Sequence, residues 1–491
     1  MKFYEIDNAL QEAIIAADKP VRVKIQIGLE GVPEPDILEA DFYGLKETAG
    51  GTSARGEILL DNSQGVYSCT NAGPGTKVKV SFSLGDGLPY FERFIFYLDD
   101  KGIQDIQGPG RKRFVRLALN DLSAKLRKTD EKRDWTAPAI FTYSVVCDKT
   151  QPEKSLVHGI AQRAGLSLTD IDCSTIPVTL PFVRLTKNIW AELSGLATVY
   201  RCHLECAPEK PLVFAHSPYQ TEPLQDDDYS YTFTGQDIFY LRKTDRAELY
   251  RNSVRLKINL PIALEKQEIW RYDGAPVLYD QNLRPHYPFK YPLVREIEAG
   301  NYEAHYSVID IGGKERAVVF ADEIDTKGEA ENRLEYDGGP FSYSGYDVSS
   351  CTDKAILTLR KETDGDLLRA VIYGRPIVLD LNRSYFGNDS EGIAAYGTAA
   401  LNVTGSYFSE YLIEGKPQYE DWVGRELAER IQNKREFTVK THRGLFNARV
   451  GAKVRISIKG ELLRGMINTY IFRYRKNEAF VASFKIRENF V

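Results

Sequence analysis

The sequence predicts a mainly β protein with an α+β insert: two related antiparallel β-barrel domains and a small α/β domain between them. Apolar and polar residues alternate strictly over residues 21–27 and 77–84, which is typical of strands with one buried and one solvated face. Similar stretches return over 254–259 and 451–458. Residues 152–166 instead place apolar residues at helical spacing. The chain therefore combines half-solvated antiparallel sheets with a helical interruption.

Length and composition are those of a multidomain globular protein. The 491 residues suggest three or four domains, and 43% hydrophobic with 27% charged residues is ordinary for a folded chain. The 69 acidic and 64 basic residues nearly cancel, which argues against a nucleic-acid coat. The 29 tyrosines favour partly buried strand faces and wet interfaces. We therefore expect a folded protein with many partly buried β surfaces.

The amino-terminal segment carries Glu5, Asp7 and Glu12 where a secretory signal needs an uninterrupted apolar stretch. No apolar run approaches the roughly 18 residues of a membrane helix. We therefore expect a short amphipathic helix at this end and no stable membrane insertion, with folding in the cytoplasm where the chain is made.

Changes between strand-like and helix-like residue patterns divide the sequence into five segments. We expect an N-terminal helix or arm over 1–17, a first β-barrel over 18–135 and a small α/β insert over 136–228. A second, mostly β domain then covers 229–400, and a C-terminal helix and strands over 401–491 complete the second barrel. Within the insert, helices are predicted over 152–166 and 186–200, the second with Thr186 as N-cap, and a hairpin over 205–217. A third helix is predicted over 418–432.

The two halves show an internal correspondence. Residues 254–259 nearly copy 21–26, and residues 451–458 echo 75–82, in the same order along the chain. Amphipathic strands can resemble one another by chance, but agreement of both pairs in order favours two related barrels.

The sequence shows no recognisable catalytic centre. A phosphate-binding loop, a Gly-x-Ser-x-Gly nucleophile elbow and a His-Glu-x-x-His motif are all missing. The histidines lie mostly far apart and form no evident pair with a cysteine: His158, His203, His216, His286, His305 and His442. A glycosidase would need two singled-out carboxylates, and nothing singles out a pair. We expect no catalytic residue, no cofactor and no enzymatic activity.

The best candidate for a metal site is Cys202-His203-x-x-Cys206 with His216 ten residues further on. Structural zinc sites generally need two closely spaced ligand pairs on turns. Here the cysteines flank an apparent strand, so core packing is the preferred interpretation and no metal ligand is predicted. The six cysteines are scattered, which argues against a disulfide framework: Cys69, Cys147, Cys173, Cys202, Cys206 and Cys351.

One basic cluster stands out, at Gly108-Pro109-Gly110-Arg111-Lys112-Arg113. Three charges without interleaved aromatic residues bind nucleic acid weakly. A solvated loop or a subunit contact is therefore favoured over a nucleic-acid site.

The order and spacing of several short motifs resemble the hub proteins of phage tails and baseplates. The stretch 51–68, the strand 75–82 and the strand 94–98 follow one another as in that family, although the glycine usual in the third is absent. The helices 154–161 and 190–197 resemble the hub patterns Ser-Leu-x-x-x-Ile-Ala and Trp-x-x-Leu-x-x-Leu-Ala. Downstream, Tyr396-Gly397, Leu427-Ala428 and Gly451-x-x-Val454 keep the family order.

The resemblance implies a non-enzymatic structural role in the virion tail. A hub carries two tube-like barrels per chain, and its homotrimer closes a ring of six units that adapts a six-fold tail tube to a three-fold spike or fibre. It implies as partners the tail tube or distal tail protein, the spike or fibre protein and the tape-measure protein, with DNA only in transit. Alternatives are the hub of a contractile injection or secretion apparatus, a tail-associated cell-wall hydrolase, and a receptor- or sugar-binding β protein.

Overall fold

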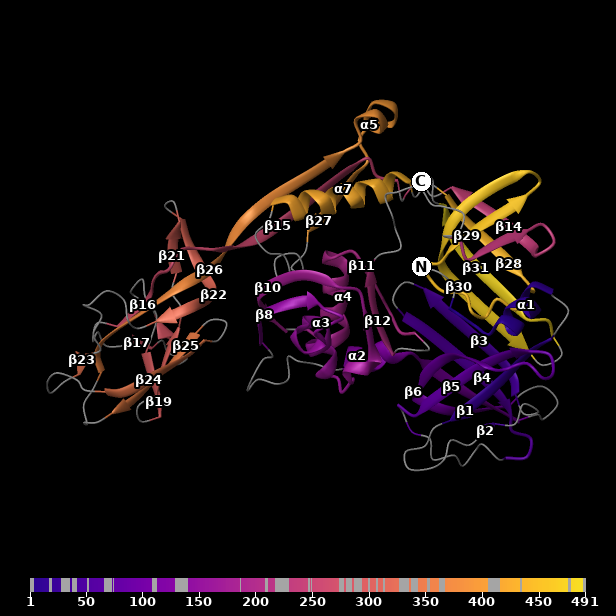
Figure 1. Ribbon diagram of the computed structural model, residues 1–491, viewed down its shortest axis with the longest axis horizontal. Helices are drawn as coiled ribbons and strands as arrows, with labels where there is room; N and C mark the ends of the chain where they lie inside the picture. The colour runs from indigo at the N-terminus through magenta and orange to yellow at the C-terminus, as the bar shows by residue number, and fades with distance from the viewer. Residues whose placement is uncertain are drawn as a thin grey trace.

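The computed structural model gives the protein an elongated shape in which sheets dominate (Figure 1). It describes residues 4–16, 20–27, 36–37, 42–50, 53–65, 73, 75–107, 113–128, 140–185, 187–207, 211–216, 229–245, 248, 250–272, 278–279, 285–286, 294–298, 301–305, 308–311, 314–325, 335–336, 343–350, 354–361, 367–404, 416–432, 435–475 and 478–488.

Strands from both ends of the chain form one 13-stranded sheet. The N-terminal unit contributes β1 (Val21–Ile27), β2 (Asp36–Ile37), β3 (Phe42–Gly50), β4 (Ser53–Asp61), β5 (Lys77–Leu84), β6 (Phe91–Gln107) and β7 (Arg113–Asn120). The C-terminal unit contributes β13 (Tyr231–Thr234), β14 (Ile238–Asp245), β28 (Arg435–Thr441), β29 (Lys453–Ile458), β30 (Glu461–Arg475) and β31 (Val481–Glu488). Figure 1 shows the two units side by side, one indigo and one mostly yellow.

The expected alternation decides which faces are buried. β1 alternates buried and half-buried residues along its whole length, because successive side chains of a strand point to opposite faces. Its buried side chains join one apolar core with β5 and with strands of the C-terminal unit. The helix α1 (Asn8–Ala16) adds Leu10 and Ile14 to this core.

The insert has two small sheets covered by helices. β8 (Ile140–Cys147) pairs with β10 (Ile176–Arg184), while β9 (Ile171–Cys173), β12 (Leu212–His216) and β11 (Cys202–Glu205) form the other sheet. β11 and β12 form the predicted antiparallel hairpin. The helices are α2 (Leu122–Lys128), α3 (Leu156–Gln162) and α4 (Ile189–Val199), with 3-10 turns η4 (Pro152–Lys154) and η5 (Leu168–Asp170).

Two predicted helix ends in the insert differ from the structure. α3 is shorter than predicted, because residues 152–154 form a separate 3-10 turn before it. α4 begins after Asn188, whose side chain accepts a hydrogen bond from the Ala191 amide, so Asn188 is its N-cap. The predicted cap, Thr186, lies outside the described residues.

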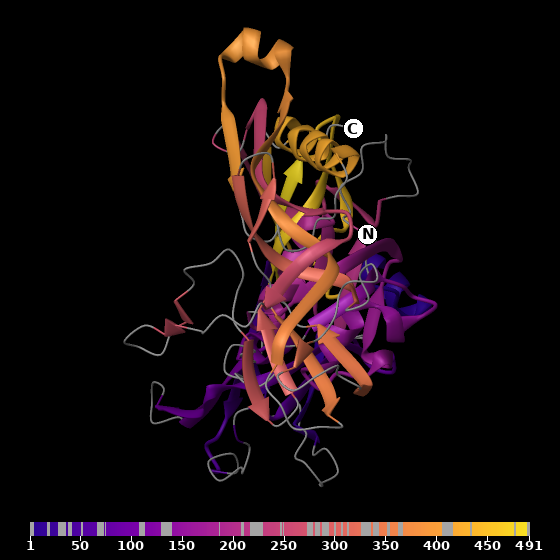
Figure 2. The same cartoon turned by 90° about the vertical axis from the view of Figure 1, so that its left-hand side faces the viewer.

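The middle of the chain builds further sheets. β15 (Ser253–Ala263), β16 (Gln267–Tyr272), β21 (Val308–Ile311), β22 (Lys314–Asp325), β23 (Glu335–Tyr336), β26 (Leu367–Asn388) and β27 (Ala400–Thr404) form a seven-stranded sheet. β19 (Val294–Glu298), β20 (Asn301–His305), β24 (Tyr343–Ser350) and β25 (Lys354–Lys361) form another, and β17 (Leu278–Tyr279) pairs with β18 (Pro285–His286). Figure 2 shows α5 (Ser390–Tyr396) at the far end of the long β26.

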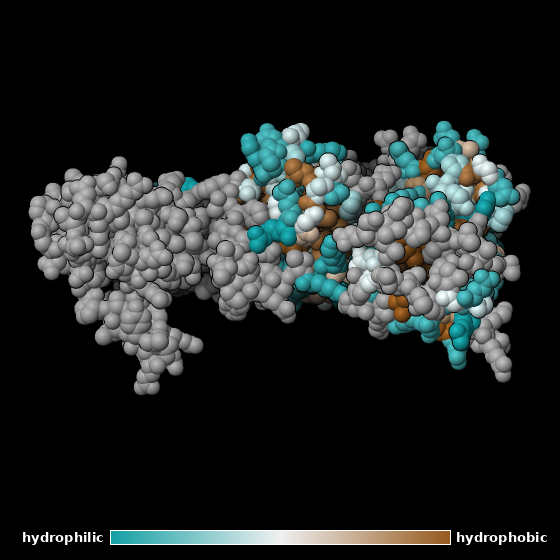
Figure 3. Space-filling view, turned by 90° about the horizontal axis from the view of Figure 1, so that it is seen from below, coloured by the Kyte–Doolittle hydropathy of each residue, from teal (hydrophilic) through white to brown (hydrophobic). Residues whose placement is uncertain are grey.

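A second apolar core fixes the insert to this middle sheet. It joins the insert helices to Val254 and Leu256 of β15 and to Tyr419 and Trp422 of α7 (Lys416–Gln432). On the lower face, the described residues form a mosaic in which hydrophilic side chains surround small apolar patches (Figure 3). No helix in the described part of the chain is long and apolar enough to cross a membrane.

The expected segment 229–400 does not stay within one sheet. β13 and β14 pair with β29 and β28 of the C-terminal unit, whereas the chain from β15 to β27 belongs to the middle sheets. The alternating pattern shows that a strand has one buried face but does not identify the strand beside it.

Candidate subunit interface

The two units of the large sheet have the same strand order. The N-terminal unit reads β3-β4-β7-β6-β5-β1, and the C-terminal unit reads β14-β28-β31-β30-β29-β13. Each position pairs antiparallel with its neighbour, except that β13 runs parallel to β29 where β1 runs antiparallel to β5. The predicted pair of related antiparallel β domains is therefore confirmed.

Only one of the two sequence echoes marks equivalent strands. Residues 451–458 lead into β29, which occupies the place that β5 has in the first unit and likewise pairs with the next strand of the chain. Residues 254–259 lie in β15, which pairs with β26 and β27 outside the large sheet. The similarity of 254–259 to 21–26 therefore reflects a shared amphipathic pattern, and that half of the prediction was wrong.

The units are joined edge to edge by β3 and β30. The two strands run antiparallel, in register from Gly44 opposite Arg475 to Gly50 opposite Thr469. Aromatic rings continue the contact beneath the sheet, where the Phe82 and Phe446 rings stack with centroids 5.3 Å apart. The joint between the units is thus a continuous sheet over a shared core.

A buried cation reinforces this joint. Arg93 of β6 is 1% exposed, and its guanidinium donates to the Ala448 carbonyl at 2.5 Å and to the Tyr470 hydroxyl at 2.7 Å. It also lies over the Tyr4 ring, 4.7 Å from the centroid. A buried charge is costly unless hydrogen bonds and ring faces replace its water. Arg93 therefore fixes the N-terminal unit to one geometry against the C-terminal unit.

In each unit, the counterpart of a strand in the β3–β30 joint has an edge without a partner among the described strands. In the C-terminal unit, β30 continues beyond β29 and uses that edge to pair with β3. The equivalent β6 also continues beyond β5, which pairs only as far as Tyr97, and residues 103–107 of β6 pair with β7 alone among the described strands. β14, the equivalent of β3, pairs with β28 alone in the described part of the sheet. β3 and β30, which form the joint within the chain, thus have β14 and β6 as counterparts with an edge unpaired among the described strands.

Both open edges carry exposed apolar side chains. Phe239 and Tyr240 on β14 are 51% and 39% exposed, and Ile106 on β6 is 36% exposed. The Phe239 ring stacks on the His442 imidazole, and the Lys440 ammonium lies over the Tyr240 ring, so both aromatic residues are held in place. Exposed edges with ordered aromatic residues are suited to strand pairing with another chain.

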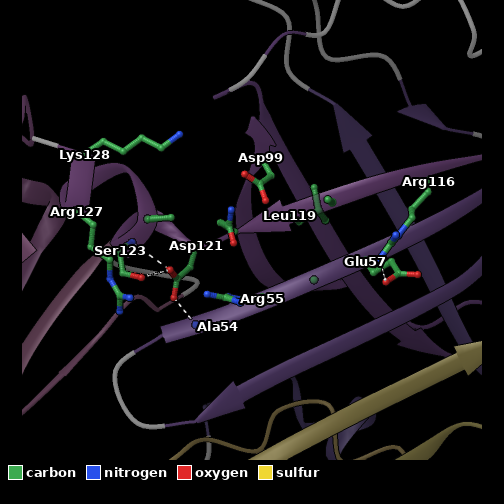
Figure 4. Close-up of a pocket in the computed structure, with 14 residues that line it drawn as sticks. Ala54, Arg55, Glu57, Asp99, Arg116, Leu119, Asp121, Ser123, Arg127 and Lys128 are labelled. Carbon is green, nitrogen blue, oxygen red and sulfur yellow. Dashed lines mark hydrogen bonds and ion pairs between the residues drawn. The ribbon is translucent and has the colours of Figure 1, made fainter. Parts of the chain in front are cut away.

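A pocket of about 680 Å³ lies on the outside of the first unit, between β4, β7 and α2 (Figure 4). Burial raises the pKa of one of its acids, Asp121, which is 5% exposed. The Asp121 carboxylate accepts hydrogen bonds from the Ala54 amide, the Ser123 amide and the Ser123 hydroxyl. Because these protein donors occupy the carboxylate, Asp121 orders the start of α2. We assign it no catalytic step.

The metal candidate from the sequence is only partly assembled. Cys202 and His216 face each other across β11 and β12. The His203 Nε2 atom instead hydrogen-bonds Glu205 at 2.9 Å, and the half-buried Cys206 lies near Asp121. A different group comes together: Cys147, His158 and Cys173 offer ligand atoms within 4.8 Å of one another. Of the basic cluster, residues 108–112 lie outside the described residues, and Arg113 begins β7 with an exposed side chain.

No protein-family model matches the sequence, and no curated protein matches it. Solved structures do resemble the fold. A tail protein from Neisseria meningitidis MC58 shares 8% identity with a TM-score of 0.50, over 96% of this chain and 97% of that one. The 43 kDa tail protein of prophage MuSo2 from Shewanella oneidensis shares 10% identity with a TM-score of 0.49, over 95% and 98%. An E. coli component of the type VI secretion system shares 9% identity with a TM-score of 0.41, over 95% and 77%.

The chain therefore has the fold of the Neisseria tail protein. The likeness to the Neisseria tail protein extends over nearly the whole of both chains, so the insert and middle sheets belong to the shared architecture along with the two-unit sheet.

Proposed function

We propose that the protein is the structural hub of a phage tail tip or baseplate. Three copies close a ring of six sheet units, which adapts the six-fold tail tube to a three-fold spike or fibre and surrounds the channel for DNA and the tape-measure protein. The observation that carries the proposal is the β3–β30 joint between two units of equal strand order. Among the described strands, the counterparts of this joint, β14 and residues 103–107 of β6, each keep one edge without a partner strand.

The internal joint predicts how neighbouring chains pair. If β14 of one chain pairs with β6 of the next chain in the way that β3 pairs with β30 within one chain, each added chain forms the same head-to-tail contact. Such contacts close into a ring when the rotation between copies is about 120° for three chains. Within one chain, β14 and β6 are seven strand steps apart in the sheet order. At about 4.8 Å per step, they are too far apart along the sheet to pair with each other.

The register of the proposed β14–β6 joint between chains can be derived from the β3–β30 joint within one chain. In the N-terminal unit, the pairings across β4 and β7 connect Leu45 of β3 to Ile103 of β6. In the C-terminal unit, the pairings across β28 and β31 connect Leu241 of β14 to Tyr470 of β30. Leu45 therefore corresponds to Leu241, and Ile103 corresponds to Tyr470. Transferring the β3–β30 register then places Lys243 of one chain opposite Asp105 of the next. Opposite charges on directly facing residues favour an antiparallel pair.

Cysteine cross-linking tests this arrangement. The variant Lys243→Cys with Asp105→Cys should give, on mild oxidation, a covalent species of three chains of 55.6 kDa each. The matched control combines Lys243→Cys with Asp86→Cys, since Asp86 is also acidic and exposed but lies in the turn before β6. Light scattering of the unmodified protein should show the same trimer at high concentration. A stable dimer with a two-fold interface, or equal cross-linking of the control, would refute the ring.

A further inference from the structure

Three side chains from separate elements of the insert meet in its core. Cys147 is the last residue of β8, Cys173 is the last residue of β9, and His158 lies in the first turn of α3. They are 0%, 5% and 3% exposed. Their ligand atoms lie within 4.8 Å of one another.

The distances suit a small thiophilic cation. Zinc binds thiolate sulfur at about 2.3 Å and imidazole nitrogen at about 2.0 Å, so ligand atoms around a tetrahedral zinc lie roughly 3.5–3.8 Å apart. The ligand atoms of Cys147, His158 and Cys173, all within 4.8 Å of one another, are close to that spacing. The three residues therefore already form most of a closed coordination shell.

A neighbouring hydroxyl orients the histidine. The Ser155 hydroxyl and Nδ1 of His158 are hydrogen-bonded at 2.7 Å, and Ser155 also hydrogen-bonds the Cys147 thiol. Ser155 is itself 3% exposed. Buried partners of this kind fix the ring orientation of histidines that bind metals.

We propose that Cys147, His158 and Cys173 hold one structural zinc-class ion. The site connects the two separate sheets of the insert, β8-β10 and β9-β12-β11, to the helix α3. Its burial leaves no access for a substrate, so its role is to stabilise the fold and not to catalyse. Cys202 begins β11, in the same small sheet as Cys173, and is the candidate for a fourth ligand.

Metal analysis and cobalt spectroscopy of the full chain test the site. The purified protein should contain about one zinc per chain, and exchange for Co²⁺ should give the sulfur-to-cobalt absorption band of thiolate coordination. Cys173→Ser and His158→Asn should each reduce bound metal at least tenfold. Cys206→Ser is the matched control, because this half-buried thiol of the same insert lies near Asp121 instead, and it should keep the metal.

A second readout separates metal binding from folding. Added zinc should raise the unfolding temperature of the metal-stripped wild type but leave that of Cys173→Ser unchanged, with circular dichroism confirming that both chains are folded. Loss of metal in Cys202→Ser would identify the fourth ligand, and its retention would leave that position to water. A protein without metal or cobalt uptake, or a Cys147–Cys173 disulfide in the purified chain, would overturn the proposal.

Discussion

The guanidinium of Arg449 forms an ion pair with the carboxylate of Glu205, joining the C-terminal unit to strand β11 of the insert. Both side chains are largely buried, at 18% and 10% exposed. His203 contributes a second contact to the same carboxylate at 2.9 Å, and the Tyr4 hydroxyl lies 3.5 Å from it. Arg449, His203 and Tyr4 thus all contact the Glu205 carboxylate, although they lie far apart in the sequence. These contacts couple the position of the insert to the large sheet.

Removing the cation of this pair should destabilise the fold strongly. Arg449→Met leaves Glu205 buried with one fewer partner, which should lower the free energy of unfolding by about 3–5 kcal/mol. Chemical denaturation measures the change. Arg22→Met is the control, because its partner Asp86 is 97% exposed, and this loss should stay below about 1 kcal/mol. Equal effects of the two substitutions would contradict a structural role for the buried pair.

Acid should weaken the same contact. Burial opposes ionisation of Glu205, but His203 and Arg449 outweigh it and hold the pKa of the carboxyl below its ordinary value of 4.5. A lowered folded-state pKa contributes stability that is complete above pH 4.5 and is lost as the pH falls through the folded pKa. In that window, unfolding free energy should decline more steeply for wild type than for Glu205→Gln. Parallel pH profiles would argue against this linkage.

Arg201 should hold helix α7 against the insert. Its guanidinium contacts Glu426 at 2.6 Å and Glu429 at 2.5 Å, all three side chains being 15% exposed or less. Arg201→Met leaves Glu429 without this cation and Glu426 with Arg430 alone, so amide hydrogens of α7 should exchange faster. Arg425→Met breaks the exposed ion pair with Asp421 in the same helix and should leave exchange nearly unchanged. Similar exchange in both variants would show that α7 is held by apolar packing alone.

The turn between β29 and β30 offers a stabilising change. Lys459 and Gly460 both have positive φ, 50° and 82°, as in a type I′ hairpin turn that prefers Asn-Gly. Lys459→Asn should raise the unfolding free energy by about 0.5–1 kcal/mol, because asparagine tolerates this conformation better than lysine. Lys485→Asn, at an exposed position within β31, should instead be neutral or destabilising. A loss of stability in Lys459→Asn would mean that the lysine makes contacts that outweigh its backbone strain.

Alternation in the sequence was sufficient to predict β1 and β5, because their buried face must be apolar at every second residue. It could not predict the β3–β30 joint, since backbone hydrogen bonds create that pairing and leave no residue signature. The same limit explains the misplacement of 254–259: β1 and β15 share a pattern but have different neighbours.

The candidate metal group was missed for a related reason. Motif searches depend on ligands a few residues apart, as in Cys202-His203-x-x-Cys206. Cys147, His158 and Cys173 instead come from two strands and a helix that only the packed insert brings together. The open edges were equally hidden, because β14 has no strict alternation and its importance lies in its place within the sheet.

A charge exchange tests the proposed register between chains. Asp105→Lys places a cation opposite Lys243 of the neighbouring chain and should weaken each joint by about 1 kcal/mol. Because three joints close a ring, the concentration for half-assembly should rise roughly tenfold in sedimentation experiments. Adding Lys243→Asp restores opposite charges and should recover the trimer. Lys243 also pairs with Glu461 of its own chain at 2.6 Å, so Glu461→Gln is the control: it removes the internal pair and should leave assembly intact. Failure of the double variant to assemble better than Asp105→Lys would reject this register, even if cross-linking still demonstrated a trimer.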